Sequence, residues 1–188
     1  RLRPRLLILL GNPALLMRDE YRELWGDIPI VLCSEENYLG PQETYTKKQA
    51  IATADRTPLT QLADPYNMVL LYSNLYLDEN IQLICHIVPE IKKFIFIGDA
   101  RQINQTNNLD IRNKLKKTHP NVEYQFITPQ DMTTNQLLDS LYFVDPKTTG
   151  VLFSSWFYKT TFAGNTSLVS NAHKLIGTTA APIFTLNM

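Results

Sequence analysis

The chain has 188 residues, of which 44% are hydrophobic and 19% are charged. This length is enough to bury a substantial core, either in one large domain or in two small ones. Lysine and arginine together number 18, as do aspartate and glutamate, so the formal net charge at pH 7 is zero. A balanced charge provides no overall field to attract nucleic acid or an anionic membrane, so we expect no nucleic-acid partner.

The beginning of the chain predicts two buried strands with a helix between them. Continuous apolar runs occupy Leu6–Leu10 and Ile28–Cys33, as is typical of parallel strands that are buried on both faces. In the intervening segment, Asn12 can cap a helix and Pro13 suits its first turn, while Gly26 suits its end.

The polar stretch Tyr38–Asn74 interrupts this pattern, because it contains one glycine and three prolines and predicts only a short helix near Pro58–Ala63. We expect the chain to leave one lobe for the next within residues 64–78, where Met68–Tyr72 can form a strand. A long surface loop and a β-hairpin are alternative interpretations of this stretch.

The rest of the chain alternates between apolar runs and segments with helical periodicity. The predicted strands are Phe94–Ile97, Val122–Ile127, Val151–Phe153 and Ile183–Leu186. The predicted helices are Asp78–Val88, Leu109–Thr118, Gln136–Phe143 with Thr133 or Thr134 as its cap, and Leu168–Ile176 with Ser167 as its cap.

This alternation predicts an α/β protein with doubly wound parallel sheets. We expect two lobes: residues 1–70 form a partial first lobe with a hinge-side segment, and residues 71–188 form a Rossmann-like second lobe. No apolar run approaches the roughly 20 residues that cross a bilayer. The sequence opens without a signal peptide and ends directly behind an apolar run, so we expect it to be a fragment of a longer parent protein.

Several kinds of chemistry have no motif in this sequence. Glycine-rich phosphate loops, a nucleophile elbow and the usual spacings of metal ligands are all missing. Cys33 and Cys85 lack CxxC partners, and a disulfide between them is left open. We therefore expect no catalytic residue, no metal site and no cofactor, and we do not expect this domain by itself to be an enzyme.

The candidate ligand contacts follow the predicted strands, because ligands of open parallel sheets bind outside the carboxyl ends of the strands. The candidates are Asn12, Ser34, Glu35, Asp99, Arg101, Thr128, Ser154, Ser155 and Trp156. Asp99 and Arg101 are suited to grip opposite ends of a ligand, and Trp156 is suited to form an apolar wall. The alternatives are a surface turn in which Asp99 pairs with Arg101, and an aromatic cluster that fills the edge of a core.

Five segments, in their order along the chain, resemble type I periplasmic binding proteins, in the branch of ABC-transporter substrate-binding proteins and their sensor relatives. They are Leu6–Ala14, Asp27–Leu32, Val88–Asp99, Thr149–Phe153 and Ala181–Phe184. The resemblance implies a small molecule bound in a cleft between two lobes, whose closure the ligand favours.

The same resemblance implies either the sensor of a membrane histidine kinase or the solute-binding component of a transporter, and the expected longer parent protein favours the sensor. We expect the periplasmic or extracytoplasmic sensor domain of a two-component histidine kinase, within a membrane-anchored parent protein. Its ligand is a small molecule that the sequence does not identify, and a homodimer is left open. The alternatives are the solute-binding component of an ABC transporter and a degenerate protein-interaction module that has lost its ligand.

Overall fold

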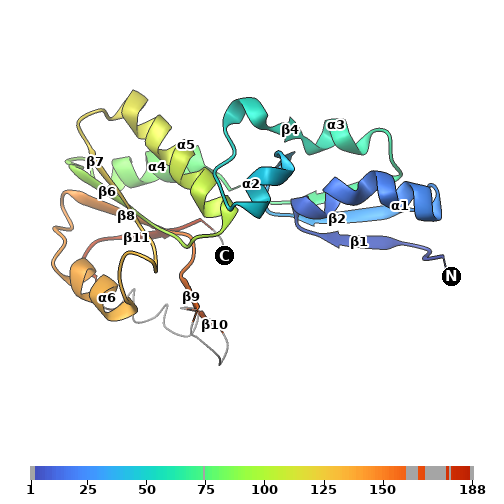
Figure 1. Cartoon of the computed structure of the whole chain (residues 1–188). Helices are drawn as coiled ribbons and strands as arrows, with labels where there is room; N and C mark the ends of the chain where they lie inside the picture. The colour runs from blue at the N-terminus through green and yellow to red at the C-terminus, as the bar shows by residue number, and fades with distance from the viewer. Residues whose placement is uncertain (1–2, 74, 160–164, 168–176, 178, 187–188) are drawn as a thin grey trace. The chain divides into compact units, whose positions relative to one another are not determined.

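The computed structural model describes residues 3–73, 75–159, 165–167, 177 and 179–186. The contacts divide the chain into two units, Arg1–Leu75 and Tyr76–Met188. Each unit contains a parallel sheet whose strands alternate with helices, as Figure 1 shows, so the predicted α/β class with parallel sheets is confirmed.

The sheet of the first unit has three parallel strands in the order β1–β2–β5: β1 is Leu7–Leu10, β2 is Ile30–Ser34 and β5 is Met68–Tyr72. A 3₁₀ turn, η1 (Asn12–Met17), and helix α1 (Arg18–Trp25) connect β1 to β2. Because both crossovers carry the chain across the sheet in the same direction, the right-handed rule places them on the same face.

Helices cover one face of this sheet. Leu9 and Leu32 point to that face and pack in one cluster with Leu15 of η1 and Leu59 of α3 (Leu59–Ala63). The opposite face exposes between 54% and 77% of four aliphatic side chains, those of Ile8, Leu10, Val69 and Leu71. The continuous apolar run Leu6–Leu10 predicted burial on both faces, and this is wrong for β1, because a run of aliphatic residues does not show which faces are covered.

Two neighbouring residues of β1 provide a direct test of this difference. Leu9→Ala is expected to lower the free energy of unfolding by about 2–3 kcal/mol, because it leaves a cavity among buried leucines. Ile8→Thr keeps the β-branched shape on the exposed face and is expected to change stability by less than about 0.5 kcal/mol. Urea denaturation of the two variants measures both values, and equal losses would contradict the described faces.

The polar stretch after β2 forms a small substructure. Strands β3 (Tyr38–Leu39) and β4 (Thr57–Pro58) pair antiparallel, and α2 (Gln42–Thr46) and the 3₁₀ turn η2 (Thr53–Asp55) lie between them. The stretch then continues into β5, which pairs with β2. This pairing places the division between the units after Leu75, whereas the sequence-based division was drawn at residue 70.

The sheet of the second unit has four parallel strands in the order β11–β8–β6–β7. These strands are β6 (Lys93–Ile97), β7 (Glu123–Ile127), β8 (Thr149–Phe153) and β11 (Ile183–Thr185). The described helices of this unit include α4 (Leu77–Ile87), α5 (Gln102–Thr118) and α6 (Thr134–Tyr142). A separate antiparallel pair is formed by β9 (Phe157–Lys159) and β10 (Asn165–Ser167).

Alternate residues of β6 belong to two cores on opposite faces of this sheet. Phe94 and Phe96 pack with α4 and α5, whereas Ile95 and Ile97 pack in the cluster that contains Leu137 of α6. Figure 1 shows α4 and α5 on one side of the sheet and α6 on the other. The second unit is therefore doubly wound.

Helix α5 differs most from the prediction. It begins at Gln102, whereas the sequence predicted a start at Leu109. Residues 102–108 carry mainly polar side chains, so they lack the apolar spacing by which a buried helix face is recognised. They are nevertheless helical, and several of them, including Asn104 and Asn107, are buried.

One predicted helix cap is confirmed and another is wrong. Thr133 caps α6 as predicted: its hydroxyl accepts the backbone N–H of Gln136, and the Gln136 side chain accepts the N–H of Thr133. The expected cap at Asn12 is wrong, since Gly11 precedes η1 and the Asn12 side chain caps no helix. The helix predicted over residues 168–176 falls outside the described residues.

Candidate functional site

The order of the strands places a topological switch point between β6 and β8. From β6 the chain passes through α5 to β7 on one side, and from β7 it returns through α6 to β8 on the other side of β6. The connections on the two sides lie on opposite faces of the sheet. Loops that leave neighbouring strands in opposite directions open the place where α/β sheets bind ligands.

Asp99 lies at this switch point, directly behind β6, and only 2% of it is exposed. Its Oδ1 atom accepts the backbone N–H of Arg101 at 2.9 Å and the Asn104 amide at 2.7 Å. Its Oδ2 atom accepts the hydroxyl of Ser155, which follows β8, at 2.7 Å. One buried carboxylate therefore connects the loops after two adjacent strands with the first turn of α5.

Asn104 and Ser155 also bind each other, since the Asn104 amide donates to Ser155 Oγ at 2.8 Å. Gly98 permits this approach of α5 to the end of β6. A Cβ atom at position 98 would lie 3.2 Å from Cβ of Asn104 and 3.0 Å from the Phe126 ring. We call Asp99, Asn104 and Ser155 the switch-point cluster.

Three buried polar atoms belong to α5 and to the loop after β8. Among the described residues, Asn104 Oδ1, Asn107 Nδ2 and Ser154 Oγ are buried without a hydrogen-bond partner. A buried polar atom that lacks a partner costs roughly 1–3 kcal/mol. Each such atom calls for an explanation, and a bound ligand, a catalytic role and an ordered water are the usual ones.

The sequence named five candidates that the structure places near this edge of the sheet: Asp99, Arg101, Thr128, Ser154 and Ser155. It did not name Asn104 or Asn107. A signal existed, because positions 104, 107, 111 and 115 follow helical spacing and Ile111 and Leu115 are buried in the core beside α5. Along this buried face of α5, positions 104 and 107 carry amides, and positions 111 and 115 carry apolar side chains.

Thr128 serves a turn. Its backbone N–H and its hydroxyl both donate to Asp131 Oδ2 at 2.8 Å, and its carbonyl accepts the N–H of Asp131. This arrangement stabilises the loop after β7 from within. The side chain therefore has a structural role that explains its burial.

Trp156 is a core residue. It is 2% exposed and packs in the cluster on the α6 face, where its Nε1–H donates to Thr134 Oγ1 at 3.1 Å. This packing is that of the alternative interpretation, in which the ring fills the edge of a core, and the apolar wall for a ligand stays a prediction. A tryptophan behind a strand can turn either to solvent or beneath the adjacent helix, and sequence does not distinguish the two.

The remaining candidates lie in the first unit, and two of them meet. Ser34 Oγ–H donates to Asn12 Oδ1, and the Asn12 amide donates to the backbone carbonyls of Glu36 and Tyr38. These bonds use both ends of the Asn12 amide, so the pair fastens the loops after β1 and β2. Glu35 is exposed and has no place in this network.

Glu36 is the buried carboxylate of that loop, at 7% exposure, and the Tyr38 hydroxyl donates to its Oε1 at 2.6 Å. The guanidinium of Arg56 lies over the Tyr38 ring, 4.7 Å from its centre. Of the two adjacent glutamates, the sequence selected the one that points to solvent. Side chains alternate along an extended chain, but their phase depends on the register of the loop.

Burial shifts the ionisation of three other side chains. It raises the pKa of Tyr45, whose hydroxyl accepts the Gly40 N–H at 2.9 Å, to about 12. It also raises the pKa of Tyr124 and that of Cys85. All three groups therefore stay protonated at neutral pH.

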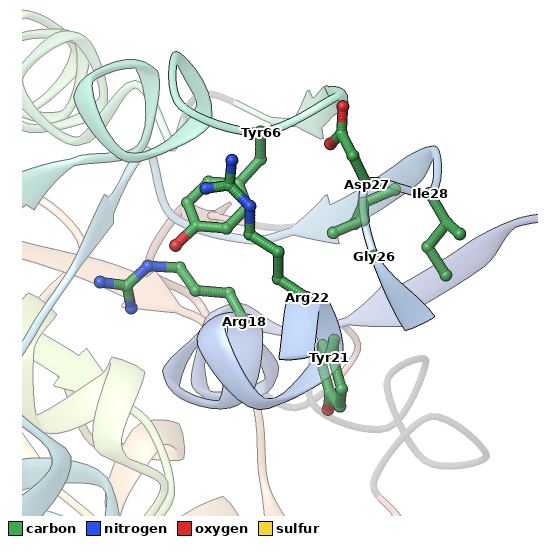
Figure 2. A pocket seen from close by; sticks show the side chains of 8 residues that line it. Arg18, Tyr21, Arg22, Gly26, Asp27, Ile28 and Tyr66 are labelled. Carbon is green, nitrogen blue, oxygen red and sulfur yellow. The ribbon is translucent and has the colours of Figure 1, made fainter. Parts of the chain in front are cut away.

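A hollow in the first unit lies at the amino end of β2, where Gly26, Asp27 and Ile28 form part of its lining (Figure 2). The guanidinium of Arg22 stacks over the ring of Tyr66, 5.3 Å from its centre, and the Tyr66 hydroxyl donates to Asp19. Ligands of parallel sheets bind at the opposite, carboxyl end. These contacts fasten α1 to the turn before β5.

Three further observations concern only the residues that the structure describes. No helix there has the length and apolar character needed to span a membrane. No group of three or more histidine, cysteine, aspartate or glutamate side chains is placed to hold a metal ion. Cys33 and Cys85 are both free thiols.

Comparisons with known proteins add no relative to this description. No family model matches the chain, and no curated protein or solved structure is significantly similar to it. What is established is an α/β fold with two parallel sheets.

Proposed function

We propose that this chain is the extracytoplasmic ligand-sensing domain of a membrane signalling receptor, a two-component sensor histidine kinase. The single observation that supports a ligand site is the group of buried, unpartnered polar atoms at the switch point of the second sheet. The compartment, the membrane anchor and the kinase come from the resemblance to type I periplasmic binding proteins.

The switch-point cluster suits recognition because it is rigid. Each of its members makes at least two of the hydrogen bonds described above, and all are buried. A site held in this way loses little conformational entropy when a ligand binds. Ser154, next to the cluster, has a hydroxyl that is left for another partner.

The proposal is tested by thermal unfolding of the whole chain in the presence of a panel of amino acids, sugars, nucleosides and dicarboxylates. A compound at a concentration one hundredfold above its Kd stabilises the native state by about 2.7 kcal/mol, which raises Tm by several degrees. Ser154→Ala is expected to keep or raise the Tm of the free protein, because the buried hydroxyl that it removes has no partner. The same variant is expected to bind the compound about tenfold more weakly.

Ser140→Ala on α6 is the matched control, since its hydroxyl donates to the carbonyl of Leu137 in its own helix. This variant is expected to respond to the compound as the unmodified chain does. The proposal fails if no compound raises Tm, or if Ser154→Ala keeps the full response.

The parent gene separates the sensor from the solute-binding component of a transporter. A membrane span followed by kinase modules would support the sensor, and an exported chain without them would indicate the transporter. A location of the ligand in a cleft between two lobes stays a prediction.

A further inference from the structure

We propose that the ligand of the switch-point site carries an oxyanion group, a carboxylate or a phosphate, which the guanidinium of Arg101 binds through its Nη atoms. This inference rests on the proposed function, because it names the ligand class for the same site. The sequence predicted that Asp99 and Arg101 both contact the ligand. In this proposal Arg101 contacts the ligand, and Asp99 positions Arg101.

Asp99 is not available to a ligand, because its acceptors are already used. Oδ1 accepts the N–H and Nε–H of Arg101 and the amide of Asn104, and Oδ2 accepts Nε–H and the Ser155 hydroxyl. An ionised carboxylate has about four lone-pair sites. These contacts fill them, and only 3% of the Asp99 side chain is exposed.

Arg101, by contrast, has donors that no described residue uses. Its Nε lies 3.1 and 3.0 Å from the two carboxylate oxygens of Asp99, and its Cζ lies 4.8 Å from the centre of the Phe157 ring. The side chain is 43% exposed. A guanidinium has five N–H donors, and among the described residues only the one on Nε is used. The four donors on the Nη atoms remain.

This geometry differs from that of an ordinary surface ion pair. A pair of exposed charges contributes little, because both side chains are mobile and solvated. Here the carboxylate is buried, and the guanidinium is held at its Nε edge by Asp99 and on one face by Phe157. The ordering cost of Arg101 has thus been met before any ligand arrives, and its Nη edge is the part that a planar oxyanion recognises.

The amino end of α5 also favours an anion. Helix α5 has 17 residues and begins at Gln102, without a side-chain cap and without an acidic residue in its first turn. The amino end of a helix carries a partial positive charge. At the same edge, the N–H of Ser154 donates to the carbonyl of Ile97, and its unpartnered hydroxyl can donate to an oxyanion.

The test follows the Nε–Hε resonance of Arg101 by NMR in the whole chain. Acetate and inorganic phosphate are the probes, acetamide is the neutral analogue, and ionic strength is held constant with chloride. We expect a saturable shift with at least one oxyanion and none with acetamide. A response to acetate alone identifies a carboxylate ligand, and a response to phosphate alone identifies a phosphate ligand.

Arg101→Lys keeps the charge but loses the planar pair of Nη groups. It is expected to weaken binding of the active probe about tenfold or more, as read from the backbone amide of Ser155. Arg112→Lys, at an exposed position of the same helix, is the matched control and is expected to bind as the unmodified chain does.

The inference is overturned if neither oxyanion gives a saturable shift at Arg101, if acetamide acts as acetate does, or if Arg101→Lys keeps its affinity. These failures differ from failure of the proposed function. If neutral compounds raise Tm and require Ser154 while Arg101 ignores both oxyanions, the site stands and its ligand class is wrong. If no compound in the panel raises Tm, the sensing function itself is contradicted.

Discussion

Asp99→Ala is expected to lower the free energy of unfolding of the second unit by about 3–4 kcal/mol. The change removes the acceptor for three different residues, Arg101, Asn104 and Ser155. Asn104 is fully buried, so its amide loses a bond that water cannot readily replace. The loss is smaller than for a fully buried ion pair, because the guanidinium of Arg101 can turn to solvent.

Denaturation by guanidinium chloride, followed by circular dichroism, measures this loss. Asp139→Ala is the matched control: Asp139 is an exposed residue of α6, and its replacement is expected to cost less than about 0.5 kcal/mol. Asp99→Asn keeps one carbonyl oxygen and is expected to lie between the two. If Asp99→Ala were as stable as Asp139→Ala, the switch-point cluster would not be a structural unit.

Phe96→Ala is expected to cost about 3–5 kcal/mol, because it empties the centre of the core beneath α4 and α5. Phe96 has no exposed surface and stacks on Phe126 with ring centres 5.2 Å apart. It also lies on an inner strand of the sheet, since β6 pairs with both β7 and β8. The surrounding backbone therefore has little freedom to close the cavity.

Phe143→Ala removes the same side chain from the surface, where it is 83% exposed. Its cost is expected to stay below about 0.5 kcal/mol. Thermal unfolding of both variants gives the comparison. Similar midpoints for the two would mean that the core described around β6 is not the one that stabilises the unit.

The strands were predictable because their physical requirement is local. A strand covered on both faces needs consecutive apolar residues, and Phe94–Ile97 meets this requirement within β6. The cap of α6 was predictable for the same reason, since Thr133 and Gln136 lie within one turn. The order of the strands was not, because nothing in β8 itself states that it pairs with β6.

The candidate site was predictable only in part. The rule that ligands bind behind parallel strands selected Asp99 and Ser155, which do meet. It did not select Asn104, because α5 begins before the apolar spacing by which the helix was recognised. It also did not show that Trp156 turns into the core. The direction of a side chain that leaves a strand depends on contacts made by distant segments.

The attachment of Arg101 to Asp99 has a mechanical consequence. Arg101 directly precedes a helix of 17 residues, which at 1.5 Å per residue extends roughly 25 Å. The same carboxylate accepts the Ser155 hydroxyl, so it couples the start of that helix to the loop behind β8. A load on that loop would therefore reach the helix through one buried carboxylate.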